Sequence, residues 1–202
     1  MADKITILEF KELLSEMATS RCGIASYFKS LKQEFREDKY LREEYLPILA
    51  VTHYKGCEDA ETIELGEETA PWDARLNGSD ILEVVQALPS KEHEIRKSIA
   101  GTQFTEVVVR TKVPRPKMAI QIEHAGDHFQ FPQVIVDAIN KKHDKHYSDN
   151  RTLVVAFDGD YSNEDDKVVE EWLDEIRKQT DLGYFKEILL VEVSRLKVFP
   201  VV

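Results

Sequence analysis

Two acidic residues on a predicted β-hairpin are the clearest candidates for chemistry in this sequence. Asp73 lies at the start of a predicted strand over 72–76, and Glu83 lies within a second predicted strand over 81–88. The Asn77-Gly78-Ser79 turn between them is a strong hairpin signal, because Asn and Gly accept the backbone angles of tight hairpin turns. The hairpin therefore brings the two carboxylates onto adjacent strands, where both can converge on one divalent cation.

The chemistry of such a pair is that of a hard metal ion. Mg²⁺ prefers oxygen ligands, usually one or two carboxylates together with water and substrate phosphate. A bound ion of this kind generates hydroxide and neutralises charge on a phosphodiester. Glu83 also lies between Leu82 and Val84 in an otherwise apolar strand, where a charge costs free energy unless it has a partner or a metal. The alternative is structural: Asp73 is then a turn residue, and Glu83 pairs with an arginine such as Arg75.

The residues around this hairpin resemble the PD-(D/E)XK nuclease superfamily, which has the restriction-endonuclease-like fold. The likeness covers roughly residues 45–157 in a helix–strand–hairpin–helix–strand context, and looks especially like uncharacterised bacterial members of the superfamily. It rests on the stretches Pro71-Trp72-Asp73, Glu83-Val84-Val85-Gln86 and Asp137-Ala138-Ile139-Asn140-Lys141-Lys142.

The resemblance implies metal-dependent hydrolysis of phosphodiester bonds in nucleic acid. Asp73 and Glu83 would hold Mg²⁺ or Mn²⁺, while Gln86 or a lysine would position the attacking water and stabilise the developing charge. The family's lysine position, two residues after Glu83, is Val85 in this chain. Gln86, one residue further, points to the opposite strand face unless a bulge redirects it.

Superfamily members are known to carry the lysine on a neighbouring helix, and this chain has two such lysines. Lys91 lies on the helix predicted directly after the hairpin. Lys142 lies seven residues after Ile135 and four after Ala138, so it shares the inward face of its helix. We therefore expect Lys142 to be the catalytic lysine. The alternative is that its stem covers the edge of the core while its ammonium reaches solvent.

The first part of the chain, residues 1–45, is predicted to form an N-terminal helical segment. Apolar spacing indicates one helix from Asp3 or Thr6 to about residue 17 and a second from about 24 to 45. By resemblance, an acidic residue of this segment, Glu34 or Glu44, completes the metal shell, and the sequence does not choose between them.

Residues 46–202 are predicted to form the nuclease-like α/β domain, in one compact unit with the N-terminal segment. The run 48–51 reads as a short strand, and the acidic, aperiodic stretch 55–70 reads as a surface loop. Further elements are a helix over 90–99, strands over 105–111, 118–123, 152–157, 188–193 and 197–202, and helices over 132–146 and 163–179. Alternating helices and strands predict an α/β class with a mixed sheet flanked by helices.

Composition excludes several classes of protein. The 202 residues are 42% hydrophobic and lack an apolar run of membrane-spanning length, so we expect a soluble, cytoplasmic protein with a sizeable core. The net charge of −11 argues against general attraction to nucleic acid. Residues 91–117, however, carry seven basic and three acidic side chains, a local charge of +4 that would border a nucleic-acid cleft.

Two functions from different classes remain open. The first is a metal-dependent nuclease, for which the resemblance also implies a homodimer. The second is a catalytically inactive module on the same fold that acts in protein interaction or regulation. The missing lysine at Val85 and the acidic exterior favour the second function.

Overall fold

The computed structural model describes residues 4–19, 41–66, 70–89, 131–145, 147, 151–162 and 164–202. Its strands are β1 (Lys4–Thr6), β2 (Thr62–Leu65), β3 (Ala74–Leu76), β4 (Asp80–Gln86), β5 (Arg151–Phe157), β6 (Phe185–Glu192) and β7 (Lys197–Pro200). Its helices are α1 (Ile7–Thr19), α4 (Leu46–Tyr54), α8 (Phe131–His143) and α9 (Asp166–Gln179), with a short π-helix η2 (Leu41–Tyr45) and a 3₁₀ turn η4 (Gly159–Tyr161).

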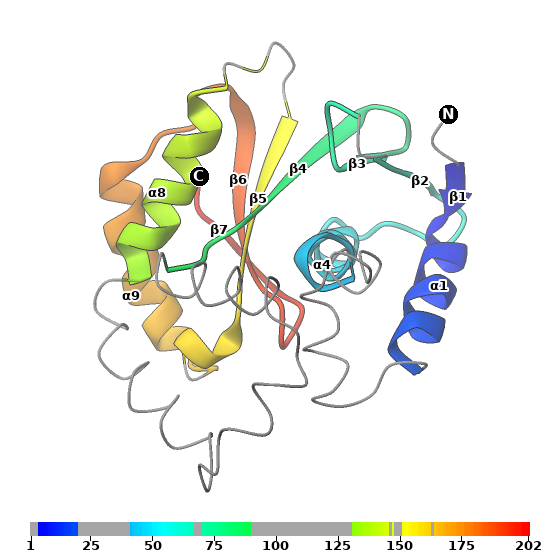
Figure 1. Cartoon of the computed structure of the whole chain (residues 1–202), viewed down its shortest axis with the longest axis horizontal. Coiled ribbons are helices and arrows are strands. Elements are labelled where there is room, and N and C mark those ends of the chain that lie inside the picture. The colour runs from blue at the N-terminus through cyan, green and yellow to red at the C-terminus, as the bar shows by residue number, and fades with distance from the viewer. Residues whose placement is uncertain are drawn as a thin grey trace, which may run out of the picture.

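One seven-stranded mixed sheet runs through the described residues in the order β1-β2-β3-β4-β5-β6-β7. Strands β1 to β4 pair antiparallel, β4, β5 and β6 pair parallel, and β7 returns antiparallel to β6. Helices α8 and α9 cover one face of the sheet, while α4 and α1 cover the other (Figure 1). The α/β class with a mixed sheet flanked by helices is thus confirmed.

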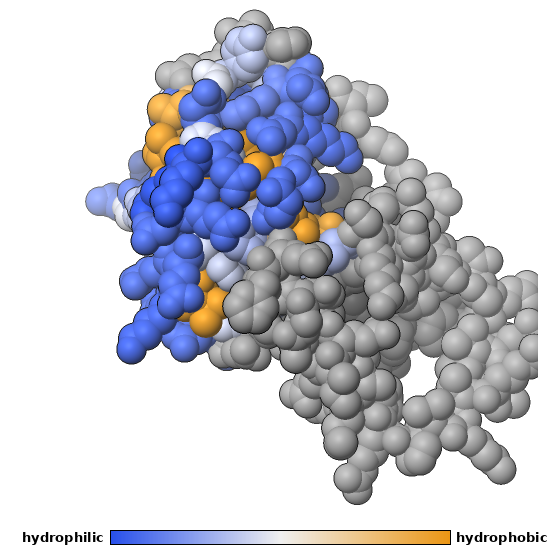
Figure 2. All heavy atoms as spheres, turned by 90° about the vertical axis from the view of Figure 1, so that its left-hand side faces the viewer, coloured by the Kyte–Doolittle hydropathy of each residue, from blue (hydrophilic) through white to orange (hydrophobic). Residues whose placement is uncertain are grey.

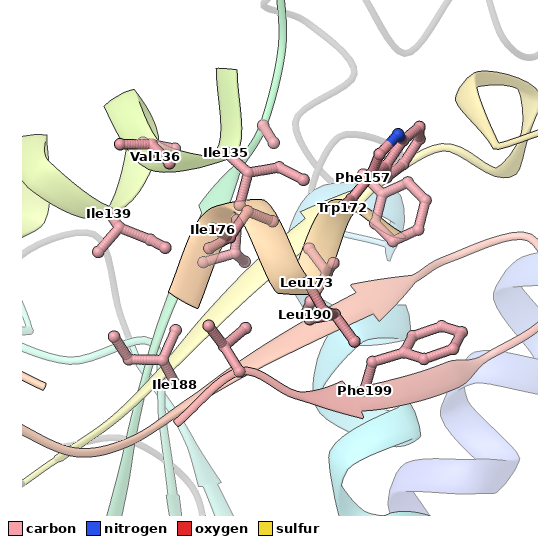
Figure 3. Packing of buried hydrophobic residues seen from close by; sticks show 14 of the residues in the cluster. Ile135, Val136, Ile139, Phe157, Trp172, Leu173, Ile176, Ile188, Leu190 and Phe199 are labelled. Carbon is pink, nitrogen blue, oxygen red and sulfur yellow. The ribbon is translucent and has the colours of Figure 1, made fainter. Parts of the chain in front are cut away.

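The core lies in two layers, one on each side of the sheet. All seven residues of β5 are buried, as expected for a central strand covered on both faces. On the α8 and α9 side, Ile135 and Ile139 of α8 belong to one apolar cluster with Trp172 and Ile176 of α9 (Figure 3). The outward face of this helical layer is largely hydrophilic (Figure 2). Each helix is therefore amphipathic, with its apolar side on the sheet.

Local sequence signals explain several element boundaries. Asn77 and Gly78 have positive φ angles of 50° and 73°, which Asn and Gly adopt more readily than other residues. They form the predicted turn between β3 and β4. The side chain of Asp165 accepts a hydrogen bond from the Lys167 N–H and caps α9, the position for which acidic and hydroxyl residues are preferred.

Two predictions about the region before the hairpin are wrong. The run 48–51, predicted as a strand, lies in the middle of α4, where Pro47 occupies the first turn. A short apolar run fits a buried helix as well as a buried strand, so periodicity alone does not separate them. The stretch 55–70, predicted as a loop, contains β2, which joins β1 to β3.

The N-terminal segment also contributes to the sheet. Strand β1, which the sequence did not predict, pairs with β2 at the edge, and Ile7 and Phe10 of α1 pack in the same apolar cluster as Leu82 of β4. The second predicted helix lies outside the described residues except for its end at η2. So do the predicted helix over 90–99 and the predicted strands over 105–111 and 118–123.

None of the helices that the structure describes has the length and apolar character needed to cross a bilayer. The basic segment 91–117 lies outside the described residues, as do Lys91 and Glu34.

Candidate active site

Asp73 and Glu83 lie on the same face of two neighbouring antiparallel strands. Asp73 directly precedes β3, and Glu83 lies within β4. Their neighbours Ala74 and Leu82 are paired across the strands and are buried in the α1 and α4 layer. Because side chains alternate along a strand, Asp73 and Glu83 both point toward the α8 side. The hairpin has thus brought together the two carboxylates that the sequence singled out.

The backbone around Asp73 is held from two directions. Its N–H donates to the Leu82 carbonyl at 3.1 Å, and its carbonyl accepts from the Gly66 N–H at 2.8 Å. A Cβ added at Gly66 would lie 2.1 Å from the Trp72 carbonyl oxygen. Glycine is therefore required for this close approach of the two chain segments, and it helps to fix the carboxylate of Asp73.

The carboxylate of Asp73 is partly buried and accepts one hydrogen bond from the described residues. Its Oδ2 accepts a 2.6 Å hydrogen bond from the Val84 N–H, and the described residues donate no hydrogen bond to Oδ1. Burial raises the pKa of Asp73, and the charge of Glu83 raises it further, although the Val84 N–H and the Lys142 ammonium act in the other direction. Burial and the charge of Glu83 therefore disfavour the ionised form of Asp73 relative to a solvent-exposed aspartate.

Glu83 is in the opposite situation, because three cationic or hydroxyl groups converge on it. Its Oε1 accepts from Lys142 Nζ at 2.5 Å and from the Tyr147 hydroxyl at 2.6 Å. Its Oε2 accepts from Arg151 Nη1 at 3.0 Å. Lys145 Nζ lies 4.0 Å from Oε1 on a half-exposed side chain. Glu83 is itself only 6% exposed, so these partners supply what water cannot.

These contacts set the ionisation of the pair. Burial on its own would raise the pKa of Glu83, but hydrogen bonds from Lys142 and Tyr147, together with the charges of Lys142 and Arg151, outweigh it and lower the pKa. Burial and the hydrogen bond to Glu83 raise the pKa of Tyr147 well above its usual range, so its hydroxyl stays protonated. Glu83 is therefore a firmly ionised carboxylate beside Asp73, whose own charge is disfavoured.

Arg151 joins three parts of the site. Besides Glu83, its Nη1 donates to the Pro71 carbonyl at 2.7 Å, and its guanidinium lies over the Tyr147 ring, 4.0 Å from the ring centre. Arg151 is 3% exposed. It thus ties the segment that leads into Asp73 to the carboxylate of Glu83 and holds Tyr147 against both.

The structure brings Lys142 to the carboxylates but not Gln86. Lys142 lies in the last turn of α8, which crosses the face of β4 that bears Glu83. Gln86 is the last residue of β4 and pairs with β5 in unbroken register, so its side chain points to the face opposite that of Glu83. There its amide donates to the Glu43 carbonyl at 3.4 Å. Glu44 belongs to the same short helix, η2, and so lies toward that opposite face.

Arg151 and Tyr147 were not predicted as site residues. The arginine that the sequence suggested, Arg75, instead meets Glu64 at 3.4 Å and lies over the Trp72 ring. A weak signal for Arg151 existed, because it opens a strand that is otherwise mostly apolar and fully buried. A buried arginine in such a strand requires an acid, and Glu83 is the acid on the paired strand.

Two other charged clusters have the features of structural networks. Lys55 bridges Glu187 and Asp80, and Thr152 donates to Glu187 at 2.7 Å, which ties α4 to the sheet. Separately, the buried Glu192 accepts from Ser162 at 3.2 Å and pairs with Arg195 in the β6–β7 hairpin.

The carboxylate pair contains the type of oxygen donor that a hard divalent cation prefers. Among the described residues, no group of three or more His, Cys, Asp or Glu side chains is arranged to hold a metal ion. Mg²⁺ needs only one or two protein carboxylates, because water and substrate phosphate complete its shell. Asp73 and Glu83 are two such carboxylates, and Lys142, Tyr147 and Arg151 already donate to both oxygens of Glu83.

Comparisons with protein families, with curated proteins and with solved structures find no match for this chain.

Proposed function

We propose that this chain hydrolyses phosphodiester bonds in nucleic acid with the help of Mg²⁺ or Mn²⁺. The observation that carries the proposal is the convergence of Asp73, Glu83 and Lys142, which come from three different elements, on one face of the sheet. Two acids and a cation at one place are the minimum set that such hydrolysis requires.

The order of elements around the site supports the finer fold assignment, the restriction-endonuclease-like fold. A helix (α4), a strand (β2), a hairpin (β3–β4), a helix (α8) and a strand (β5) follow one another in the described residues. The resemblance implies the same order, although its expected strand over 48–51 is part of α4 and its expected helix over 90–99 lies outside the described residues. Asp73 and Glu83 lie on the hairpin, as the resemblance implies.

Each residue of the site has a role in this proposal. Asp73 and Glu83 would hold the ion, which when bound would supply a Lewis acid that activates water and neutralises phosphate charge. Lys142 would orient the attacking water and stabilise negative charge on the phosphate as the bond to the leaving oxygen breaks. Arg151 and Tyr147 orient Glu83. The basic segment 91–117 would bind the nucleic-acid backbone.

One observation favours the second function, a catalytically inactive module of the same fold. Both oxygens of Glu83 already accept hydrogen bonds, from Lys142 and Tyr147 on one and from Arg151 on the other. A carboxylate saturated in this way is also what a structural ion-pair cluster contains. In that case the protein would act through a protein partner.

Calorimetric titration with Mn²⁺ separates the two functions. The wild type would be compared with Asp73→Asn and Glu83→Gln, which keep the shape of each side chain. Glu64→Gln is the matched control, because Glu64 carries the same charge on the neighbouring strand β2 and lies outside the pair. Binding that disappears in the first two variants and persists in the control supports a metal site at the hairpin.

A cleavage assay then addresses the substrate. Single-stranded and double-stranded DNA and RNA would be incubated with the wild type and with Asp73→Asn in Mn²⁺. Cleavage by the wild type alone supports the nuclease function. Metal binding without cleavage of any of these substrates would contradict it, and absence of metal binding would favour the inactive module.

A further inference from the structure

We propose that the indole ring of Trp72 stacks on an unpaired base of single-stranded nucleic acid and so holds the strand beside Asp73. The inference rests on the proposed function and names its substrate class. Because stacking needs no metal ion, the binding of a strand can be measured separately from its cleavage.

Trp72 differs from the other tryptophan of the chain because it does not contribute to the core. Trp172 is 5% exposed and packs in the α8 and α9 layer. Trp72 is half-buried, and it belongs neither to that apolar cluster nor to the cluster formed with α1 and α4. A tryptophan outside the core presents a rigid apolar ring and a polar N–H together, and such side chains dominate many binding surfaces.

The ring of Trp72 is stacked with a single cation. The guanidinium of Arg75 lies over it, with Cζ 4.7 Å from the ring centre. Among the described residues, no other ring or cation lies against this indole, and none accepts a hydrogen bond from its N–H. That N–H is not buried, so the polar edge of the ring meets solvent. A base stacked on the indole would extend the existing stack, to which Arg75 adds a cation–π contribution.

This stack lies where the α8 and α9 layer does not cover the sheet. On β3, Ala74 and Leu76 are buried in the α1 and α4 layer, so Arg75 between them points to the face that bears Asp73. The α8 and α9 cluster contains residues of β5, β6 and β7 but none of β2 or β3. Figure 1 shows both helices beside β5 and β6, whereas β2 and β3 lie toward the other end of the sheet. Since the Arg75 side chain is 32% exposed, this face is accessible next to Asp73.

Backbone contacts fix the ring relative to the carboxylate. Trp72 and Asp73 are consecutive, and the Gly66 N–H donates to the Asp73 carbonyl at 2.8 Å. On the other side, Arg151 donates to the Pro71 carbonyl at 2.7 Å. A base stacked on Trp72 would therefore be held at a defined place beside Asp73, which is what the positioning of a substrate requires.

The charges near Asp73 complement a phosphate backbone. Lys145 Nζ lies 4.0 Å from Oε1 of Glu83 on a side chain that is 53% exposed, and its positive charge acts on Asp73 as well. An aromatic ring and an exposed ammonium thus flank the same carboxylate, and both are groups that bind single strands. A duplex fits less well, because its bases already stack on one another and offer no free face within the helix.

Binding in EDTA, without divalent ions, tests the inference. Fluorescein-labelled oligothymidylate, oligouridylate and a DNA duplex would be titrated with the protein and followed by fluorescence anisotropy. We expect Trp72→Leu to weaken the binding of single strands by roughly tenfold, which corresponds to about 1.4 kcal/mol and to the loss of one stacked base. Trp72→Phe keeps an aromatic face, so its affinity should stay within about threefold of the wild type.

The matched control is Tyr54→Leu. Tyr54 is an aromatic residue that is 49% exposed at the end of α4, on the opposite side of the sheet. Its replacement should change the affinity for single strands by less than about twofold, as is usual for surface positions outside a site. Circular dichroism and the melting temperature of each variant would establish that it is folded.

The emission of Trp72 gives a readout that a purely structural role would not change. The chain has two tryptophans, so the spectrum of Trp72→Phe contains only the tryptophan emission of Trp172. The difference between the wild type and this variant therefore isolates Trp72. We expect saturable quenching of that difference by the oligonucleotide, and an unchanged difference at saturation would overturn the stacking.

The salt dependence of binding tests the contribution of Lys145. For a single strand, the loss of one phosphate contact lowers the slope of log affinity against log salt concentration by about 0.7. We expect this decrease in Lys145→Met. Lys11→Met, which removes a lysine that pairs with Asp59 on α1, should leave the slope unchanged. Equal slopes in the wild type and Lys145→Met would overturn the phosphate contact at Lys145.

The outcomes distinguish the inference from the proposed function. Weaker binding of single strands by folded Trp72→Leu, with quenching of Trp72 in the wild type, supports the inference, and the oligonucleotide bound more tightly identifies DNA or RNA. Equal binding by the wild type and folded Trp72→Leu, or tighter binding of the duplex, overturns the inference and leaves the proposed function standing. Binding that depends on Trp72 without cleavage in Mn²⁺ supports the inference and contradicts the nuclease function. No binding of any oligonucleotide overturns both.

Discussion

Arg151 Nη1 lies 3.0 Å from Oε2 of Glu83, and both side chains are almost completely withdrawn from solvent. The two residues stand on paired parallel strands, and 68 positions separate them in the sequence. This ion pair anchors the candidate site to the centre of the sheet, since the same Arg151 nitrogen also binds the Pro71 carbonyl next to Asp73.

Replacing Arg151 should therefore destabilise the folded protein. We expect Arg151→Met to lower the free energy of unfolding by about 3–5 kcal/mol, because it leaves the carboxylate of Glu83 buried with one partner fewer. Urea denaturation of the metal-free protein would measure this change. Lys11→Met is the comparison, since Lys11 pairs with Asp59 on the exposed surface and should cost less than about 1 kcal/mol. Equal losses of unfolding free energy in the two variants would show that the buried Arg151–Glu83 pair is no more stabilising than the exposed Lys11–Asp59 pair.

Asp73 should reduce the stability of the metal-free protein at neutral pH. Its pKa is raised in the folded state by burial and by Glu83, so folding favours its protonated form. The stability contribution is thus present at low pH and is lost as pH rises through the folded-state pKa. We expect Asp73→Asn to be more stable than the wild type at pH 7 without metal, with the difference shrinking as pH falls through the raised folded-state pKa toward 3.8. A destabilised Asp73→Asn at pH 7 would contradict this sign.

The contribution of Glu83 to stability should depend on pH in the opposite way to that of Asp73. Its folded-state pKa is lowered, because hydrogen bonds and charges from Lys142, Tyr147 and Arg151 outweigh the effect of burial. Its contribution to stability is therefore present above the ordinary value of 4.5 and is lost as pH falls through the lower folded-state pKa. Acid denaturation of the wild type and of Glu83→Gln would measure it. The variant should lose less stability than the wild type over this pH range.

Gly66 should matter for the site although it carries no side chain. In Gly66→Ala the new methyl group would lie 2.1 Å from the Trp72 carbonyl oxygen, so the segment that carries Asp73 has to move. We expect a loss of about 1–3 kcal/mol of stability, as for other overpacked positions, and weaker binding of Mn²⁺. Gly56→Ala is the control, because a methyl group there meets nothing within 4 Å, although its φ of 67° disfavours alanine. It should leave Mn²⁺ affinity unchanged.

Cys57 should be a slow nucleophile. Burial raises the pKa of its thiol, and the neighbouring Glu61 raises it further. Because the thiolate is the reactive form, alkylation at neutral pH should be slower than for an unhindered cysteine. A Cys22→Ser background leaves Cys57 as the sole thiol of the chain. In that background Glu61→Gln should increase the alkylation rate, and an unchanged rate would show that the charge of Glu61 is unimportant.

Sequence patterns alone were sufficient for much of the architecture near the candidate site. The Asn77-Gly78 turn predicts the β3–β4 hairpin, because those two residues tolerate positive φ angles. Apolar spacing predicts α8 and α9, and the mostly apolar run 152–157 predicts β5. The same local reasoning placed Asp73 and Glu83 on adjacent strands and Lys142 on the inward face of its helix.

The tertiary structure decided which groups meet. Residues 48–51 form a helix and not a strand because α4 buries that run against the sheet, a contact that local propensity does not contain. Lys142 and Arg151 meet Glu83 across 59 and 68 positions of the chain. Periodicity reports which face a side chain occupies, whereas the partner on that face depends on how distant elements pack. The sequence thus determined the candidate acids, and the packing of α8 and β5 decided that Lys142 and Arg151 would bind Glu83.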